Sequence, residues 1–305
     1  PAQFNPCGAL RFVSQSMAKK TPILHGLAAI ASSYDVILCD IWGVLHNGVS
    51  AYADASDALL RFRQQGGHVV LVSNAPRPAP DIIGILDRFG VPREAYDGIV
   101  TSGDVTRTML DEGRWSNYHW LGPERDAGLF AKIKIPHVAL EDADVIVCTG
   151  LHDDNTETAE DYRAFITRAR QFSIPMLCAN PDIVVERGGH LIDCAGAIAK
   201  LYEEAGGETL YAGKPHAPVY AASLNLASSL TRKAPNPART LAIGDAIRTD
   251  IAGAVQAGLG SLFVLRGIHT HELGLSEGAL EDKTFEMFLN AATHRPDFAI
   301  DQLRW

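Results

Sequence analysis

Short runs of apolar, β-branched residues alternate with longer helical patterns along most of the chain, and this alternation constrains the fold most strongly. Most runs are apolar at nearly every position, whereas a strand with one wet face would alternate apolar and polar residues. Such strands suit a parallel sheet that is covered by crossover helices on both faces. The runs predict strands at 36–39, 69–72, 98–101, 145–148, 176–178, 209–211, 241–243 and 262–265.

Helical patterns fill most of the intervals between these runs, which predicts a doubly wound α/β fold with a parallel sheet. The last 25 residues predict one helix followed by an extended tail that contains Pro296. Residues 1–20 predict a loosely specified arm, because their apolar residues form no continuous pattern. The predicted helices lie near 54–65, 78–89, 102–112, 156–171, 194–205, 216–230, 248–257 and 281–292.

Charge and apolar run length restrict the class of partner. The chain has 27 Lys and Arg against 36 Asp and Glu, a net charge of −9, and an acidic protein is a poor general binder of nucleic acid. Apolar runs such as 143–148 are much shorter than the roughly 20 residues of a membrane helix. The five cysteines include no C-x-x-C pair, which favours reduced thiols and a cytoplasmic protein. We therefore expect no nucleic-acid or membrane partner.

Polar residues follow four of the predicted strands, at the sheet edge where parallel α/β proteins place their functional groups. Each of these residues taken alone is typical of an ordinary turn or helix cap. Their order along the chain is what makes them informative. They are Asp40 after 36–39, Ser73 and Asn74 after 69–72, Lys214 after 209–211, and Asp245 followed by Asp250 after 241–243.

This set of side chains suits phosphate chemistry. Two carboxylates can hold a hard cation such as Mg²⁺, and a lysine and a hydroxyl can hold phosphate oxygens. A carboxylate beside the cation can attack phosphorus to form an acyl-phosphate, a reaction that needs chiefly positioning and charge neutralisation. No G-x-G-x-x-G follows a strand and no G-x-x-x-x-G-K-[ST] is present, so dinucleotide and P-loop sites lack their phosphate-binding loop.

The same stretches resemble the haloacid dehalogenase (HAD) superfamily of phosphatases, and within it the NagD-like class IIA branch. The resemblance runs from about residue 22 to 268. The most specific stretch is the one that contains Asp245 and Asp250. The matching stretches are DIWGVLHNG at 40–48, LVSNAPRP at 71–78, CANPD at 178–182, YAGKP at 211–215 and IGDAIRTDIAGAVQAG at 243–258.

The resemblance implies a Rossmann-like core into which an α/β cap domain of the C2 type is inserted. It places the core at 21–113 and 209–305 and the cap at 114–208. Cap surfaces often pair subunits in this family, which implies a possible homodimer. The implied substrate is a small phosphorylated metabolite, such as a sugar phosphate or a nucleotide, and the implied cofactor is Mg²⁺.

The resemblance also implies a role for each site residue. Asp40 is implied to be the nucleophile and a Mg²⁺ ligand, Asp245 the second carboxylate on the metal, and Asp250 the group that orients metal-bound water. The backbone carbonyl of Trp42 is implied to complete the protein ligands of the metal. The residues implied to hold the phosphate or face the substrate are Gly43, Ser73, Asn74, Lys214 and, from the cap, Asn180 and Asp182.

One position departs from the family pattern. The usual general acid/base is an Asp two residues after the nucleophile, and here that residue is Trp42. An indole N–H only donates hydrogen bonds and exchanges no proton at neutral pH. Because general acid–base help is about 10²–10⁴-fold, we expect slow turnover or a substrate with a good leaving group. His46 is a possible substitute acid, or a loop histidine without a catalytic role.

Trp42 leaves two other functions open. The first is a protein that binds phosphorylated metabolites with little or no catalysis. The second is a 2-haloacid dehalogenase, which works without metal, although such an enzyme has no need of both Asp245 and Asp250. Two weaker patterns are the pair His269 and His271, as a metal site, and an aromatic cluster at 115–120 that packs the cap or lines a pocket.

Overall fold

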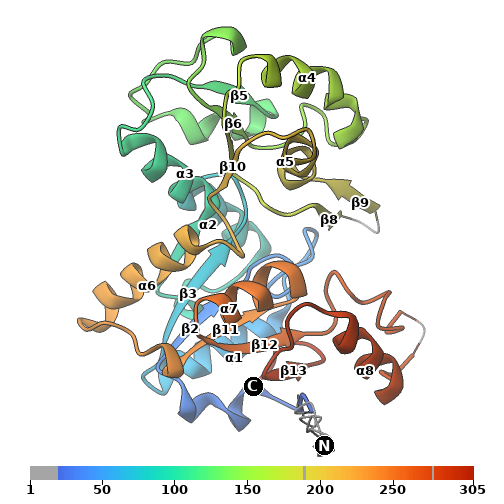
Figure 1. The fold of residues 1–305 in the computed structure, drawn as a ribbon. Helices are drawn as coiled ribbons and strands as arrows, with labels where there is room; N and C mark the ends of the chain where they lie inside the picture. Colours follow the sequence, from blue (N-terminus) through green and yellow to red (C-terminus); the bar gives the residue numbers. More distant parts are fainter. Residues whose placement is uncertain (1–19, 188–189, 277) are drawn as a thin grey trace, which may run out of the picture.

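A computed structural model describes residues 20–187, 190–276 and 278–305 (Figure 1). The predicted arm at 1–20 lies outside the described residues, apart from Lys20. The larger of two main sheets has seven strands in the order β1-β13-β12-β11-β2-β3-β4, and every neighbouring pair is parallel. The strands are β1 (Ile23–Leu24), β2 (Val36–Cys39), β3 (His68–Ser73), β4 (Gly98–Thr101), β11 (Thr240–Gly244), β12 (Gly260–Val264) and β13 (Phe298–Ile300).

Successive residues of a central strand point to opposite faces of this sheet. In β2, Ile37 and Cys39 pack with the helices of one face, and Val36 and Leu38 with those of the other. Each face of the sheet therefore packs against helices in an apolar core, as the uniformly apolar strands predict. The first face carries α1 (Ala53–Gln64) and α2 (Ala79–Phe89), and the second carries α3 (Ser102–Asp111), α6 (Ala217–Thr231) and α7 (Ala252–Gln256).

The second sheet lies above the first in Figure 1 and has four parallel strands in the order β10-β7-β6-β5. We call this sheet, its helices α4 and α5, and the antiparallel hairpin β8–β9 the cap. The helices pack on one face of the sheet through side chains such as Ile166 and Ile198. The elements are β5 (His119–Leu121), β6 (Ile146–Cys148), β7 (Met176–Cys178), β10 (Thr209–Tyr211), α4 (Arg163–Gln171), α5 (Ala195–Glu204), β8 (Val184–Arg187) and β9 (His190–Asp193).

Short helical turns connect the strands, and α8 (Asp282–Ala291) packs beside β12 and β13. The turn η8 is π-helical and leads directly into α7, so this helical segment begins at Ile247. The other turns are η1 (Leu27–Ala29), η2 (Ala31–Ser33), η3 (Arg93–Ala95), η4 (Glu124–Phe130), η5 (Leu140–Asp142), η6 (Ala159–Tyr162) and η7 (Pro237–Arg239).

The predicted fold class, a doubly wound core with an α/β cap, is confirmed, whereas several local predictions were wrong. The tail after α8 is a strand, β13, that lies between β1 and β12 in the sheet. The helix predicted at 156–171 is divided into η6 and α4, and the strand β5 was missed. The domain boundaries stay a prediction. Strand β10, assigned from sequence to the core segment 209–305, pairs with β7 in the cap sheet.

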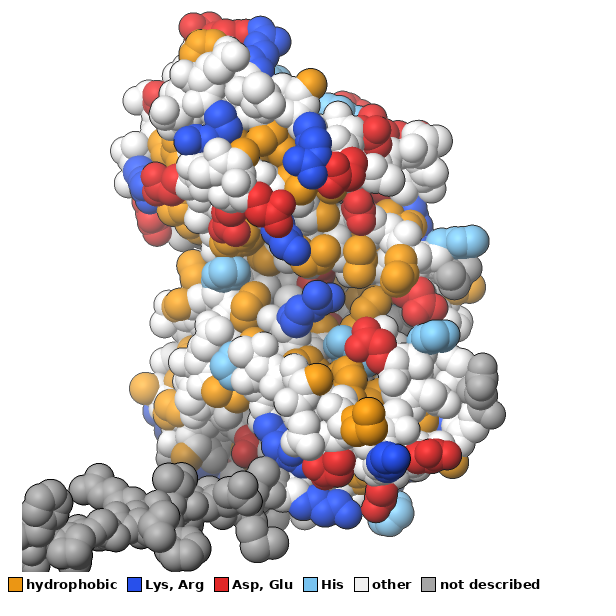
Figure 2. Space-filling view, turned by 45° about the vertical axis from the view of Figure 1, so that its right-hand side comes forward, with side chains coloured by type: hydrophobic (Ala, Val, Ile, Leu, Met, Phe, Trp, Pro, Cys, Tyr) orange, Lys and Arg blue, Asp and Glu red, His pale blue; other side chains and the backbone are white. Residues whose placement is uncertain are grey.

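The visible surface carries charges of both signs (Figure 2). Lys and Arg side chains are interspersed with Asp and Glu on this face, and hydrophobic side chains gather where the upper part of the molecule meets the lower part. Among the described residues, no helix has both the length and the apolar composition required to cross a bilayer. All four cysteines of the described chain are buried free thiols.

Candidate active site

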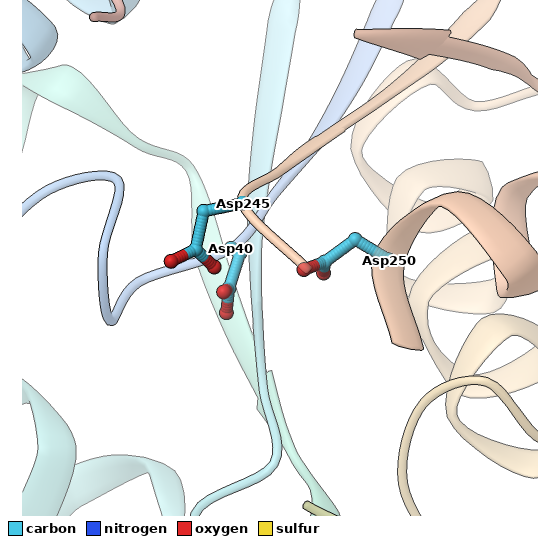
Figure 3. Close-up of side chains that lie close together, drawn as sticks. All are labelled: Asp40, Asp245 and Asp250. Atoms are coloured by element: carbon cyan, nitrogen blue, oxygen red, sulfur yellow. The ribbon is translucent and has the colours of Figure 1, made fainter. Parts of the chain in front are cut away.

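Asp40, Ser73 and Asp245 lie at one edge of the core sheet because they stand at the ends of neighbouring parallel strands. Asp40 follows β2, which lies between β11, followed by Asp245, and β3, which ends at Ser73. Figure 3 shows the carboxylates of Asp40 and Asp245 next to each other, with that of Asp250 directed toward them. Asp40, Asp245 and Asp250 are all buried, and one carboxylate oxygen from each lies within 4.8 Å of the others.

Lys214 reaches this cluster from the loop that follows β10 of the cap sheet. Its ammonium nitrogen lies 2.6 Å from Oδ1 of Asp40 and 2.7 Å from Oδ1 of Asp250. The side chain of Lys214 is only 4% exposed, so these ion pairs are shielded from water. The buried ammonium of Lys214 therefore pairs both with Asp40, after β2, and with Asp250, in η8 (Ile247–Ile251).

The charges of the cluster shift the pKa values of its members. Burial lowers the pKa of Lys214, but Asp250 and Asp40 together raise it well above its ordinary value. Burial raises the pKa of Asp40, and Lys214 opposes that shift. Burial and the charge of Asp40 raise the pKa of Asp250 to about 6, again against Lys214. The ammonium group therefore stays charged, and the carboxylates compete for it.

Asp245 is held by the backbone, and no Lys, Arg or His side chain of the described residues forms an ion pair with it. Its Oδ2 accepts a hydrogen bond of 2.7 Å from the backbone N–H of Ile268. Gly43, with a φ of +84°, and Gly267 both lie so close that a Cβ on either would overlap this carboxylate. Burial, followed by the charges of Asp40 and Asp250, raises the pKa of Asp245 well above its ordinary value.

Asn74 connects Lys214 to the cap. Its Oδ1 accepts a 2.7 Å hydrogen bond from the backbone N–H of Lys214, and its Nδ2 donates to the backbone carbonyl of the same residue. Nδ2 also donates to Oδ1 of Asp182, at 2.9 Å, in the loop between β7 and β8. The Asn74 amide therefore fixes both the lysine backbone and a cap carboxylate.

Trp42 is turned toward the cap. Its indole N–H donates a 3.1 Å hydrogen bond to the backbone carbonyl of Glu186, in β8. A Cβ on Gly48 would overlap the six-membered ring of Trp42, so the glycine is needed for this close approach. The ring also packs edge to face with His46, at a centroid distance of 5.1 Å. The Trp42 side chain thus makes a contact between core and cap.

His46 is unsuited to donate a proton at neutral pH. Burial lowers its pKa to about 4, so the ring is neutral at pH 7. Its Nδ1 accepts a 3.0 Å hydrogen bond from the backbone N–H of Gly48. The ring is 3% exposed and lies between Trp42 and Phe89. These contacts favour a structural role within the loop.

The donor set of the cluster fits a hard divalent cation. Three carboxylates converge, but in the described part of the chain only Lys214 forms ion pairs with them, and Asp245 has none. Excess negative charge at one point, presented by oxygen atoms alone, is what Mg²⁺ or a similar ion neutralises. Burial is the main cause of the raised pKa of Asp245, and the negative charges of Asp40 and Asp250 add to it.

A cavity of about 470 Å³ lies between cap and core, beside this cluster. Asp182 and Lys200 line it from the cap, and Arg248 and Ile268 line it from the core. Tyr211 and His216, from the segment that connects the two parts, also line it and are stacked at a centroid distance of 4.2 Å. The cavity therefore offers apolar, aromatic and charged side chains to a small molecule.

Comparison with known proteins identifies the family. A model described as haloacid dehalogenase-like hydrolase matches residues 37–134, and one described as HAD-hydrolase-like matches residues 211–305. A crystal structure of a hydrolase of the haloacid dehalogenase-like family from Brucella suis is 40% identical. The match covers 92% of this chain and 100% of that one, with a TM-score of 0.81. This chain belongs to the haloacid dehalogenase-like hydrolases.

More distant relatives place this HAD hydrolase in the NagD-like branch. It is 24% identical to the ribonucleotide monophosphatase NagD of Escherichia coli over 236 residues, which cover 76% of this chain and 88% of NagD. It is 28% identical to the glycerol-3-phosphate phosphatase of Gallus gallus over 269 residues, which cover 80% of this chain and 83% of that protein. The resemblance seen in the sequence motifs is thereby confirmed at the level of the family.

The remaining residues that the motifs single out in this HAD hydrolase have local partners. The Oγ of Ser73 accepts from the N–H of Ala75, which leaves its proton available to a ligand. The Oδ1 of Asn180 accepts from the N–H of Asp182 within the cap loop. His269, predicted with His271 as a weak metal pair, accepts from the N–H of Ile247 through Nε2.

Three contributors to the site were not predicted from the sequence. Gly267 and Ile268, which surround Asp245, follow β12 by a few residues, so the strand-end rule applied to this strand points to them. The carbonyl of Glu186 carried no such signal, because any residue supplies a backbone carbonyl.

Proposed function

We propose that this HAD hydrolase is a Mg²⁺-dependent phosphatase that acts on a small phosphate monoester through an aspartyl-phosphate on Asp40. The observation that carries the proposal is the buried contact of 2.6 Å between the Lys214 ammonium and the Asp40 carboxylate, beside Asp245. The names of the relatives support it, since NagD is a ribonucleotide monophosphatase and the chicken protein a glycerol-3-phosphate phosphatase. The substrate class is accordingly a sugar phosphate, a polyol phosphate or a nucleotide.

In this proposal, Asp40 is the nucleophile. Its Oδ1 is paired with Lys214, which favours the carboxylate form, and the other oxygen is the one that attacks phosphorus. Lys214 and the hydroxyl of Ser73 hold the phosphoryl oxygens, and Gly43 and Asn74 shape the same site. Asp250 keeps the Lys214 ammonium in place at 2.7 Å. Positioning and charge neutralisation are the main requirements of phosphoryl transfer.

Asp40, Asp245 and the backbone carbonyl of Trp42 are the proposed ligands of Mg²⁺, with Asp250 orienting bound water. When bound, the ion supplies positive charge to the transferring phosphoryl group. The hydrogen bond from the N–H of Ile268 fixes Oδ2 of Asp245, which leaves Oδ1 for the metal. The cap residues Asn180 and Asp182 are proposed to face the substrate at the cavity.

The test compares Asp40→Asn with Asp57→Asn on a panel of phosphate esters with and without Mg²⁺. Asp57 lies on the surface of α1 and pairs with Arg61, so its substitution is a matched acid-to-amide control. We expect Asp40→Asn to lose at least about 10³-fold in turnover and Asp57→Asn to retain it. Turnover that survives in Asp40→Asn would reject the assignment of the nucleophile.

A second candidate is a binding protein for phosphorylated metabolites that turns over slowly or not at all. The observation that favours it is Trp42, whose indole N–H is bonded to Glu186 and supplies no acid. Calorimetry that detects binding of a phosphate ester, without hydrolysis over hours, would favour this function.

The pairing of two copies through the cap also stays a prediction, and sedimentation velocity of the purified protein tests it.

A further inference from the structure

The proposed phosphatase lacks a proton donor at the position where its family places one. Trp42 stands there, and its one N–H is bonded to the carbonyl of Glu186. The leaving alkoxide of an alkyl phosphate is a strong base, so its departure needs a proton from some other group. The inference below rests on the proposed function and identifies that group.

Four other ionisable side chains of the site are already engaged. His46 is neutral and directs Nδ1 to the N–H of Gly48. Asp245 accepts from the N–H of Ile268, and Asp250 accepts from Lys214 and from the N–H of Ala246. Asp40 is itself the proposed nucleophile, paired with Lys214. None of these groups is placed to protonate an oxygen on the far side of phosphorus from Asp40.

Asp182 is placed differently, because the cap loop delivers it to the core. Its Oδ1 accepts from Nδ2 of Asn74 at 2.9 Å, so the carboxylate is tied to the residue that also fixes the Lys214 backbone. Within the described part of the chain, its Oδ2 has no hydrogen-bond partner. Asp182 also lines the cavity between cap and core. One oxygen is thus anchored while the other is available to a ligand.

Two glycines allow the Asp182 loop to lie this close to the core. A Cβ on Gly196, at the start of α5, would overlap the backbone carbonyl oxygens of Pro181 and Asp182. A Cβ on Gly213, next to Lys214, would overlap Oδ1 of Asn74 and crowd the ring of Pro181. The position of the loop is therefore defined from the cap side and from the core side.

We propose that Asp182 is the general acid and base of this enzyme, in the role that the residue at position 42 plays elsewhere in the family. In an in-line displacement, the leaving oxygen lies on the side of phosphorus opposite to the nucleophile. Asp40 attacks from the core, so the leaving oxygen faces the cap. Among the described residues, the cap lines the cavity with the carboxyl groups of Asp182 and Glu203, and Asp182 is the one that is hydrogen-bonded to Asn74 of the core site.

The proton and electron balance closes within the site. An oxygen of Asp40 forms a bond to phosphorus as the bond to the leaving oxygen breaks, and the leaving oxygen keeps the electron pair and takes the proton of Asp182. The products are an alcohol, an aspartyl-phosphate on Asp40 and the Asp182 carboxylate. Water then attacks phosphorus and gives a proton to Asp182, the bond to Asp40 breaks, and phosphate leaves. One ester and one water yield one alcohol and one phosphate.

The surroundings of Asp182 favour a carboxyl group that can hold a proton. Burial raises its pKa, and Asp250 adds to this shift. Lys214, the hydrogen bond from Asn74 and, more weakly, Arg248 oppose the shift. Asp40 and the buried thiol of Cys194 also face the group from the core and from the start of α5. The net shift is upward, so this site favours the protonated carboxyl group more than an exposed position does.

The experiment measures leaving-group dependence in Asp182→Asn, with Mg²⁺ present. Asparagine keeps the oxygen that accepts from Asn74 but donates no acidic proton. We expect kcat/KM for an alkyl ester, glycerol phosphate, to fall by about 10²–10⁴-fold. For p-nitrophenyl phosphate, whose leaving group needs no proton, we expect a fall of less than about tenfold. The inhibition constant of vanadate should stay within about threefold, because phosphate binding is retained.

The control is Glu203→Gln, a second acid-to-amide change in the same cavity, which should affect both esters equally and slightly. An equal loss on both esters in Asp182→Asn would overturn the proposal and assign Asp182 a positioning role. If Asp182→Asn fails to fold, the wild-type enzyme still decides the question with a series of aryl and alkyl esters. A shallow dependence of rate on leaving-group pKa supports proton donation, and a steep one overturns it.

Failure of this inference is distinguishable from failure of the proposed function. A wild-type enzyme that hydrolyses no phosphate ester, or an Asp40→Asn variant that still does, rejects the phosphatase itself. A phosphatase that depends on Asp40 but shows no ester-selective loss in Asp182→Asn rejects only the role of Asp182.

Discussion

The core and the cap contribute different kinds of groups to the candidate site. On the core side, Asp40 and Asp250 are paired with Lys214, and the N–H of Ile268 holds Asp245. On the cap side, Asp182 has an available oxygen and lines the cavity. The comparison teaches that one buried lysine partly neutralises three carboxylates in the core, whereas the cap contributes a carboxylate with one oxygen available to a ligand.

The largest expected effect comes from removing the only ammonium group that pairs with the core carboxylates of the described chain. Lys214→Met should abolish turnover, by about 10³-fold or more, and destabilise the protein by about 3–5 kcal/mol, because two buried carboxylates lose their partner. Urea unfolding and steady-state kinetics measure both. Lys200→Met, at an exposed cap position of the same cavity, should stay within about 0.5 kcal/mol. Equal stability of the two variants would contradict the role of Lys214 as the cation that partly neutralises the core carboxylates.

The pH dependence of the free energy of unfolding of the metal-free protein tests the core side of the same comparison. Asp250 has a native pKa raised to about 6, above its ordinary value of about 3.9 when unfolded. Between these values the native state binds more protons, so the free energy of unfolding falls as pH rises from about 4 to 6. The raised pKa of Asp245 acts in the same direction. We expect a loss on the order of 1–3 kcal/mol.

Urea unfolding at a series of pH values, with a chelator and then with excess Mg²⁺, measures this loss. The ion binds the deprotonated carboxylates of the native state, so it should flatten the pH dependence and raise stability near pH 7. Asp250→Asn should weaken the dependence without metal. Stability that rises with pH over this window in the chelated protein would show that the cluster is not short of positive charge.

A pair of glycine substitutions compares the contact between cap and core with an ordinary helix surface. Gly196→Ala should destabilise by about 1–3 kcal/mol and reduce turnover of alkyl esters, because its Cβ displaces the loop of Asp182. Gly84→Ala, in α2, has its nearest neighbour at 3.9 Å, the Nη1 of Arg88, and should gain about 0.5–1 kcal/mol. Thermal unfolding and kinetics distinguish the two. The same sign of change in both variants would contradict the close approach of the loop.

The smallest effect concerns the hydrogen bond between Trp42 and the cap. Trp42→Phe removes a hydrogen bond of about 1 kcal/mol between core and cap and should raise KM up to about fivefold, with little change in kcat. Trp120→Phe is the matched control, because the indole N–H of Trp120 donates to Thr149 within the cap. It should reduce stability and leave KM unchanged. If both variants change KM alike, the Trp42 bond does not hold cap and core together.

The sequence predicted the core side of the site well, because that side depends on strands. Uniformly apolar runs mark β2, β3 and β11, and the residues after them lie at one sheet edge wherever the strands are parallel and adjacent. Asp40 and Asp245 follow from this rule directly. The contact of Lys214 with Asp40 did not follow from it, since β10 belongs to the cap sheet. The strand-end rule grouped Lys214 with these residues as if all the strands belonged to one sheet, whereas β10 lies in the second sheet.

The cap side was less predictable for physical reasons. The hairpin β8–β9 is partly exposed along its length and lacks the apolar pattern that marks a strand. The indole N–H of Trp42 donates to a backbone carbonyl. Every residue has such a carbonyl, so the residue type does not indicate this contact. The strand β13 has three residues after Pro296, too few for periodicity to indicate a strand. Tertiary contacts, not local sequence, define these elements.

The path of the chain after β10 has a mechanical consequence. Tyr211 ends a strand of the cap sheet, and only Ala212 and Gly213 separate it from Lys214, in the core cluster. So short a connection spans about 10 Å at full extension and has little slack. A movement of the cap away from the core should therefore pull the Lys214 ammonium away from the Asp40 carboxylate. Opening of the cap would then also separate Asp40 from the positive charge that pairs with it.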